Sequence, residues 1–224
     1  MIKTVMIDVD DTLIDFPISR NVAIKELFAE YSLDFNENVL EVYTEVCTPL
    51  WAAAERGEIT GEYIRNVRWG IILKKLNIKI DESIDFEAEF RRHLSKTYFL
   101  IDGAKELLEY LSKKYTVCIA SNSYYSQQYD RLVGSGLMPY IDHIFVSNEI
   151  GVEKPSKEFF EYCLKQSASD AGEAIMIGDS VSADVKGAEN TGMKSIWFNK
   201  NRGSREGVNA DYIVDSLFEI MDIL

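Results

Sequence analysis

Residues 5–13 read VMIDVDDTL, a short apolar run followed at once by three carboxylates and a hydroxyl. Strands that are buried on both faces of a sheet are apolar throughout, so the first residues predict a central strand. Carboxylates at the end of such a strand are costly to desolvate unless a cation joins them. In open α/β sheets, this end of the strand is also where ligands bind. The stretch therefore predicts an acidic, cation-dependent site.

Working outward, further short apolar runs alternate with amphipathic stretches of helical period. This alternation predicts βαβ units, a mostly parallel sheet and right-handed crossovers, and so an α/β fold. The expected strands are residues 3–9, 116–120, 143–147, 174–178, 195–198 and, more weakly, 211–214; the expected helices are roughly 103–114, 124–136, 156–167, 182–191 and 216–223.

Residues 17–97 break this rhythm. Their apolar residues recur three and four positions apart and no convincing strand is visible, which indicates an inserted bundle of four or five helices. We therefore predict a core formed by residues 1–16 and 98–224, with a helical cap at 17–97. Because the insertion directly follows the acidic loop, we expect it to act as a lid that excludes water and selects substrate.

The chain is strongly acidic, with 37 acidic and 24 basic residues and a formal net charge of -13. Proteins that bind nucleic acid usually carry basic patches, so we expect no nucleic-acid partner. The acidity could simply favour solubility. A small anionic substrate remains compatible with it, provided that a metal and a local cation reverse the field inside the site.

Three cysteines, Cys47, Cys118 and Cys163, occur without C-x-x-C spacing. We interpret them as small buried hydrophobes of a reducing compartment. A strand expected within the first few residues leaves no room for a signal peptide, and no apolar run approaches the ~20 residues of a membrane span. The sequence therefore predicts a cytoplasmic protein with no membrane association.

In an extended segment, Asp8 and Asp10 project to the same side because residues two apart share a face. Two carboxylates in different environments can divide labour, one attacking while the other moves protons. Taken alone, the pair could equally be a solvated acidic turn that closes the strand.

Two other segments carry groups that suit a phosphate. The second core strand ends in Ser121 and Asn122, whose hydrogen-bonding side chains fit phosphate oxygens, although one serine here could instead cap the next helix. Lys154 precedes Pro155, which favours an extended backbone at the lysine. Held in that way, Lys154 could neutralise a phosphoryl group; the alternative is an ordinary loop.

The fourth core strand ends in Gly178 and Asp179, and Asp184 follows five residues later. Carboxylate oxygens are the ligands that Mg²⁺ prefers. Together with Asp8 and Asp10 there are four carboxylates, and one Mg²⁺ plus one lysine would leave a single negative charge. Without these cations the carboxylates would repel one another and take up protons. The site therefore requires a divalent ion.

These four segments, in this order, resemble the haloacid dehalogenase-like (HAD) hydrolase superfamily. Its first motif, D-x-D-x-T, matches residues 8–12, and its fourth, G-D-x-x-x-x-D, matches residues 178–184. Its second and third motifs match Ser121 and Lys154. The resemblance covers the whole chain and implies a three-layer Rossmann-like core with an inserted all-helical cap.

The resemblance also implies roles in catalysis and metal binding. Asp8 would be the nucleophile that forms an aspartyl-phosphate, and Asp10 would protonate the leaving alcohol and later activate water. Asp8 and Asp179 would bind Mg²⁺ through their carboxylates, and Asp10 through its backbone carbonyl. Asp184 would hold Lys154 or a metal-bound water. The true dehalogenases resemble this fold but lack the second aspartate and need no metal, so Asp10 favours phosphoryl transfer.

The remaining implied roles concern the substrate. Ser121, Asn122 and Lys154 would hold the phosphoryl oxygens, and Thr12 belongs to the same expected substrate-binding group. Asp11 is expected to be a turn residue without a chemical part.

The stretch from residue 48 to 60 is the most distinctive part of the insertion. Gly57 permits a tight turn and Thr60 could cap the helix that follows. In the family, this turn points at the active site, so Trp51 or Arg56 could contact the leaving group. The alternatives are packing inside the cap for Trp51 and a solvated charge for Arg56. The pattern resembles HAD phosphatases that act on pyrimidine nucleoside monophosphates.

We therefore expect a Mg²⁺-dependent phosphomonoesterase, specifically a nucleoside 5′-monophosphatase, acting as a monomer or homodimer on a small phosphorylated metabolite. The alternatives are a sugar-phosphate or phosphoglycolate phosphatase or a phosphomutase of the same fold, and a phosphate-binding module without turnover.

Overall fold

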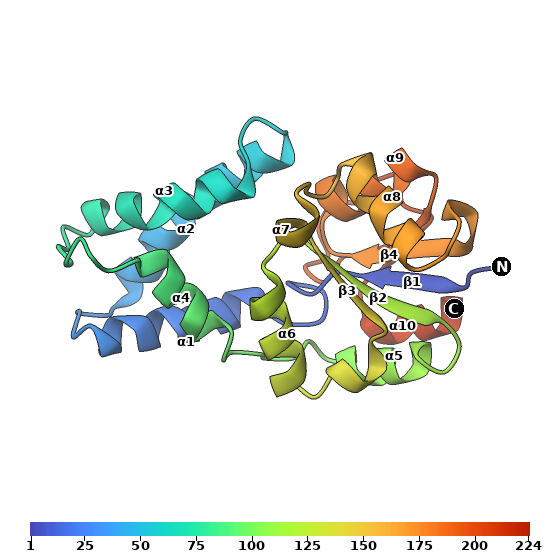
Figure 1. Ribbon diagram of the computed structural model, residues 1–224, viewed down its shortest axis with the longest axis horizontal. Coiled ribbons are helices and arrows are strands. Elements are labelled where there is room, and N and C mark those ends of the chain that lie inside the picture. The colour runs from blue at the N-terminus through green and yellow to red at the C-terminus, as the bar shows by residue number, and fades with distance from the viewer. The chain divides into compact units, whose positions relative to one another are not determined.

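The computed structural model describes residues 1–224, which form two compact units. The first comprises Met1–Pro17 and Tyr98–Leu224 and contains a sheet with helices on both faces; the second, Ile18–Thr97, is entirely helical (Figure 1). The α/β fold with an inserted helical unit, predicted from the alternation of strands and helices, is confirmed.

The sheet has six parallel strands in the order β3-β2-β1-β4-β5-β6. Its central strand β1 pairs with β2 on one side and β4 on the other, with Met6 opposite both Cys118 and Met176. The chain order reverses at this point, which is where open α/β sheets form their ligand crevice. The strands are β1 (Thr4–Ile7), β2 (Thr116–Ser121), β3 (His143–Val146), β4 (Ala174–Gly178), β5 (Lys194–Phe198) and β6 (Tyr212–Val214).

Both faces of the sheet are buried, so the strands contribute alternate residues to two apolar cores. Val5 and Ile7 pack toward α5 (Ala104–Leu111) and α10 (Leu217–Ile223). Met6 faces the opposite layer, which contains helices α8 (Lys157–Gln166) and α9 (Lys186–Thr191) (Figure 1). The other elements of this unit are α6 (Tyr125–Gly134), α7 (Ser147–Ile150) and the short turns η1 (Met138–Tyr140), η2 (Ala171–Glu173) and η3 (Val181–Val185).

The helical unit is built on an aromatic core. The Trp69 ring centroid lies 5.0 Å from that of Phe86, 5.3 Å from Phe90 and 5.7 Å from Tyr43. Thr60 caps a helix as predicted, because its Oγ1 accepts a hydrogen bond from the Tyr63 amide at 3.1 Å. The helices are α1 (Phe16–Glu30), α2 (Glu37–Glu55), α3 (Gly61–Lys75) and α4 (Phe86–Leu94).

A buried ion pair joins two of these helices. Arg68 on α3 donates to both carboxylate oxygens of Glu87 on α4, at 2.6 and 2.7 Å, and to the Tyr43 hydroxyl at 3.1 Å. Two parallel bonds fix the relative position of the groups as well as their charge. The pair therefore sets how α4 packs against α3.

The three cysteines are buried, as expected, and each is a free thiol. None of the helices has both the length and the apolar character that a membrane span requires.

We predict that Glu87→Ala destabilises the protein, because it leaves the buried Arg68 guanidinium without its carboxylate partner. Breaking a buried pair in this way costs about 3–5 kcal/mol, measurable as a lower free energy of unfolding in urea. The matched control is Glu45→Ala, which removes an exposed ion pair with Lys75 and should change stability little. Equal effects of the two substitutions would contradict this account of the helical unit.

Candidate active site

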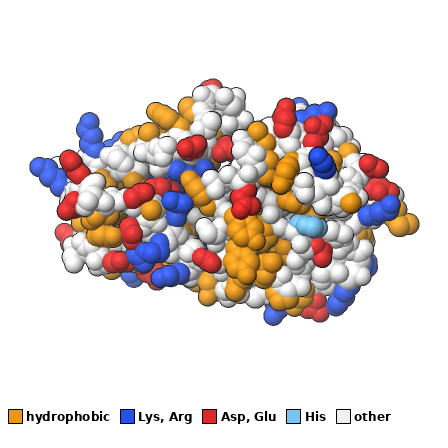
Figure 2. All heavy atoms as spheres, in the orientation of Figure 1, with side chains coloured by type: hydrophobic (Ala, Val, Ile, Leu, Met, Phe, Trp, Pro, Cys, Tyr) orange, Lys and Arg blue, Asp and Glu red, His pale blue; other side chains and the backbone are white.

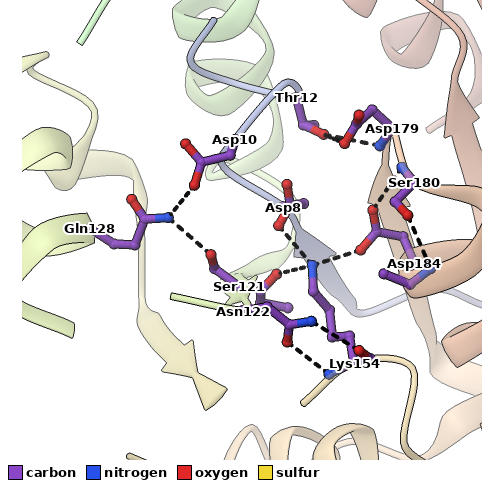
Figure 3. A network of polar contacts seen from close by, with 12 residues as sticks. Asp8, Asp10, Thr12, Ser121, Asn122, Gln128, Lys154, Asp179, Ser180 and Asp184 are labelled. Atoms are coloured by element: carbon purple, nitrogen blue, oxygen red, sulfur yellow. Dashed lines mark hydrogen bonds and ion pairs between the residues drawn. The ribbon is translucent and has the colours of Figure 1, made fainter. Parts of the chain in front are cut away.

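The predicted core residues gather at the carboxyl ends of adjacent strands. Asp8 follows β1, Ser121 ends β2 and Asp179 follows β4, and Lys154 approaches from the loop after α7 (Figure 3). Parallel strands end at the same edge of the sheet, so residues far apart in sequence meet there. The structure thus brings together the residues of the four motifs predicted from the sequence.

Lys154 lies at the centre of this cluster and is buried. Its Nζ donates three hydrogen bonds, each 2.7 Å long, to Oδ1 of Asp8, Oδ1 of Asp184 and the carbonyl oxygen of Ala120. An ammonium group has three protons, so all of its donors are used. Burial by itself lowers the pKa of Lys154, but Asp184 and Asp8 outweigh it and the pKa lies above its ordinary value. Lys154 is therefore a permanent positive charge.

Asn122 fixes the loop that carries this lysine. Its Oδ1 accepts from the Lys154 amide at 2.8 Å, and its Nδ2 donates to the Lys154 carbonyl at 2.9 Å. The pair of bonds imitates a strand pairing and locks the backbone at Lys154, which precedes a cis peptide bond to Pro155. The sequence assigned Asn122 to phosphate; that contact stays a prediction, and the contacts seen are with Lys154.

Asp184 approaches the end of β4 closely. Its Oδ2 accepts from the Ser180 amide at 3.1 Å, and its place is set by η3, a single π-helical turn of the kind often found at functional sites. A Cβ atom at Gly178 would lie 2.1 Å from that same oxygen. The glycine of the fourth motif is therefore required by the approach of Asp184, which in turn holds Lys154.

Thr12 and Asp179 support each other across the gap between β1 and β4. The Asp179 amide donates to Thr12 Oγ1 at 3.1 Å, and that hydroxyl lies 3.5 Å from Asp179 Oδ1. The Trp197 indole donates to the Asp179 carbonyl at 2.8 Å. Thr12 is buried and its contacts are with Asp179; its predicted contact with substrate stays a prediction.

One carboxylate oxygen from each of Asp8, Asp179 and Asp184 lies within 4.8 Å of the other two. Burial raises the pKa of Asp8 to about 7; Lys154 opposes the rise, and Asp184 and Asp10 add to it. Burial, and then Asp8 and Asp184, raise the pKa of Asp179 well above its ordinary value. Both pKa values rise for the same reasons: burial removes water from the carboxylates, and neighbouring carboxylates repel a further negative charge.

Two residues of the site are not predicted from the sequence, because residues 124–136 show only the pattern of an amphipathic helix. Gln128 and Arg131 lie on the buried face of α6 and both contact the Asp10 carboxylate, at 2.9 and 2.6 Å. Their spacing of three positions is the only sequence signal, because it places two polar groups on one helix face.

Arg131 also completes the charge balance of the site. When all four carboxylates are ionised, they exceed the two cations by two negative charges: Asp8, Asp10, Asp179 and Asp184 against Lys154 and Arg131. One divalent cation would neutralise this excess. Oxygen donors from Asp8 and Asp179 suit a hard ion such as Mg²⁺, whereas both oxygens of Asp184 already hold Lys154 and Ser180.

Asp11, the third carboxylate of the opening stretch, shapes the loop. Its backbone is left-handed, with φ of 63°, and its Oδ1 accepts from the Lys200 ammonium and from the Phe16 amide. Aspartate is among the residues that tolerate this conformation best. The prediction that Asp11 is a turn residue is confirmed.

Trp51 and Arg56 belong to the helical unit, and their structural contacts are local to it. The Arg65 guanidinium lies 5.6 Å from the centroid of the Trp51 ring, and Arg56 forms two bonds with Glu58 at 2.6 and 2.9 Å. Gly57 makes the predicted tight turn between Arg56 and Glu58, with φ of 73°. A contact of Trp51 or Arg56 with substrate stays a prediction.

We predict that Mg²⁺ raises the melting temperature of the protein and that Asp179→Asn abolishes the rise, because the substitution removes a ligand and half of the charge excess. A ligand present at 100 times its Kd stabilises by ~2.7 kcal/mol. Asp222→Asn, which changes an exposed aspartate on α10, is the control and should keep the rise. An equal rise in the Asp179→Asn variant would rule out this cluster as the cation site.

We also predict that Gly178→Ala displaces Asp184, because the new methyl group overlaps its carboxylate. Overpacking of this kind costs about 1–3 kcal/mol. Because Asp184 holds Lys154 against Asp8, its displacement should also disturb the Asp8 ligand, so the variant should lose its response to Mg²⁺ as well as stability. The matched control is Gly172→Ala, where a Cβ atom meets nothing within 4 Å. Calorimetry of both variants checks the expectation, and a Gly178→Ala variant that binds Mg²⁺ as the parent does would contradict it.

Comparisons with known proteins agree with this geometry. The profile of the haloacid dehalogenase-like hydrolase family matches residues 5–198. The putative HAD-hydrolase YfnB of Bacillus subtilis is 34% identical over 198 residues, covering 88% of this chain and 84% of that protein. Its crystal structure, bound to magnesium, superimposes with a TM-score of 0.92 at 32% identity and covers 100% of this chain and 98% of its own.

Other relatives carry named activities, among them the following two. The pyrimidine 5′-nucleotidase YjjG of Escherichia coli is 29% identical, covering 98% of this chain and 96% of that protein. A glyceraldehyde 3-phosphate phosphatase of Pyrococcus furiosus is 26% identical, covering 100% of this chain and 93% of that protein. The resemblance drawn from the four motifs is confirmed: this chain belongs to the haloacid dehalogenase-like hydrolase family.

Proposed function

We propose that this protein is a Mg²⁺-dependent phosphomonoesterase that works through a phosphorylated Asp8. The observation that carries the proposal is the buried Lys154 ammonium bound to Asp8 beside a cluster of carboxylates. A nucleophilic carboxylate, a fixed cation and a place for a divalent ion are the groups that phosphoryl transfer requires. The named activities of the two relatives support the same reaction class.

In the first step, an oxygen of the Asp8 carboxylate attacks the phosphorus atom of the ester. The bond from phosphorus to the leaving oxygen breaks as the new bond from Asp8 to phosphorus forms. Asp10, entering protonated, gives its proton to the leaving oxygen, so that an alcohol departs. Lys154 offsets negative charge on the transferring group, and the Ser121 hydroxyl donates to a phosphoryl oxygen.

In the second step, water attacks the phosphorus atom of the aspartyl-phosphate. Asp10, now a carboxylate, takes a proton from that water, and the bond between Asp8 and phosphorus breaks. Inorganic phosphate leaves, Asp8 is a carboxylate again and Asp10 is protonated for the next cycle. Asp8 and Asp179 would hold Mg²⁺, which supplies charge neutralisation for the phosphoryl oxygens.

For the substrate we propose a nucleoside 5′-monophosphate with a pyrimidine base, and for residues 17–97 the role of a cap that selects it. The support is the relationship to YjjG over nearly the whole of both chains. Trp51 offers an aromatic face on which a base could stack. The alternative is a small sugar phosphate, which the relationship to the Pyrococcus enzyme favours.

A panel of phosphomonoesters tests the substrate class. The protein should release phosphate from UMP, dUMP and dTMP with higher kcat/KM than from glyceraldehyde 3-phosphate or phosphoglycolate, and EDTA should stop the release. Higher kcat/KM for the sugar phosphates would favour the alternative. No release from any phosphomonoester in the presence of Mg²⁺ would contradict the proposal.

We predict that Asp8→Asn lowers kcat by at least about 10³-fold, because a neutral amide cannot form the acyl phosphate, while the fold persists. The matched control is Asp11→Asn in the same loop, since asparagine also tolerates the left-handed backbone. Asp11→Asn should keep activity within about tenfold of the parent. Full activity of Asp8→Asn, measured as phosphate release from UMP, would overturn the mechanism.

A further inference from the structure

Helix α6 holds the Asp10 carboxylate by both of its oxygens. Arg131 Nη1 donates to Oδ1 at 2.6 Å, and Gln128 Nε2 donates to Oδ2 at 2.9 Å. The same Gln128 nitrogen donates to Ser121 Oγ at 2.9 Å, so its amide lies between Asp10 and Ser121 (Figure 3). The position of Asp10 is therefore set by a helix, although the residue itself lies on a loop.

The Arg131 guanidinium determines which groups in this network donate hydrogen bonds and which accept them. Arginine is a donor only, and Arg131 Nη1 donates to Gln128 Oε1 at 3.0 Å. This contact fixes which way the Gln128 amide faces, so its NH₂ group must point at Asp10 and Ser121. Ser121 Oγ is then an acceptor on this side, and its own hydrogen is directed elsewhere. Each Asp10 oxygen keeps a further lone-pair site for a proton or a leaving group.

Burial makes this arrangement expensive. Gln128 and Arg131 have no exposed surface, whereas the Asp10 side chain is 29% exposed. Desolvating a guanidinium costs several kcal/mol, and an apolar side chain of similar volume would serve packing alone at least as well. Two polar side chains kept in the interior, both directed at one partly exposed carboxylate, point to a requirement of the site.

We propose that Gln128 and Arg131 are positioning residues for phosphoryl transfer. Together they hold the Asp10 carboxylate where it meets the leaving oxygen, and Gln128 turns Ser121 into a donor toward the phosphoryl group. The inference rests on the proposed function, because it gives Asp10 the proton-transfer role. It assigns to α6 a part in catalysis that none of the four motifs contains.

Leaving-group dependence separates this role from a structural one. UMP releases an alcohol that needs a proton, whereas p-nitrophenyl phosphate releases a stable phenolate that needs none. Because kcat/KM reports the steps through phosphorylation of Asp8, a misplaced Asp10 harms the first substrate far more. General acid catalysis contributes ~10²–10⁴-fold. The same measurements on the parent chain test the proposed function independently.

The variants are Gln128→Met and Arg131→Met, which keep length and remove the hydrogen bonds. For each we expect kcat/KM with UMP to fall by about 30–100-fold and with p-nitrophenyl phosphate by less than about fivefold. The matched control is Gln127→Met on the same helix, a buried glutamine whose amide contacts Ser123. For this control, kcat/KM should change by the same small factor with both substrates.

Losses that are equal for the two substrates in the α6 variants, or no loss at all, would overturn the inference while leaving the proposed function intact. A parent chain inactive on both substrates would instead overturn the proposed function. Arg131→Lys keeps the buried positive charge. Compared with Arg131→Met, it should therefore recover part of the ratio of kcat/KM for UMP to kcat/KM for p-nitrophenyl phosphate. If Arg131→Met does not fold, the Gln128→Met variant decides the question, because equal losses of kcat/KM for UMP and p-nitrophenyl phosphate would still contradict the account.

Discussion

The site depends on one buried ammonium group. Lys154 Nζ joins Asp8 on β1, Asp184 on η3 and the carbonyl of Ala120 on β2, so three segments far apart in sequence share one positive charge. A charge in the interior is stable only when its partners are in place. Two neighbouring features keep these partners in place. Asn122 forms two hydrogen bonds with the Lys154 backbone, and the absence of a side chain at Gly178 lets Asp184 reach the Lys154 ammonium.

The sheet explains why these partners can meet. The strand order places β1 between β2 and β4, and the chain turns away in opposite directions on the two sides of this point. The proposed nucleophile Asp8 lies at the centre, with the phosphate-binding candidate Ser121 to one side and the proposed metal ligand Asp179 to the other. Helix α6 then adds a layer of support from the side of β2, where Arg131 brings the second cation of the site.

The sequence contained most of the sheet and the four motifs, because buried parallel strands are continuous apolar runs and the polar residues follow them directly. It did not reveal Arg131 or Gln128. Arginine is rarely buried, and an amphipathic helix with polar positions is normally interpreted as solvated on that face. For the same reason, the charges predicted from sequence, four carboxylates with Mg²⁺ and Lys154, sum to one negative charge. Adding Arg131 makes the site neutral when Mg²⁺ is bound. The π-helical turn at Asp184 was also hidden, since residues 182–191 carry an uninterrupted helical pattern.

The central claim is that Asp8 becomes phosphorylated during turnover. Acyl phosphates survive acid, so a reaction with UMP and Mg²⁺ that is quenched in acid within the first turnover can be digested and examined by mass spectrometry. The account predicts a phosphoryl group on the peptide that contains Asp8, at a level that falls as inorganic phosphate appears. Rapid release of phosphate with no phosphorylated Asp8 peptide at any time point would contradict it.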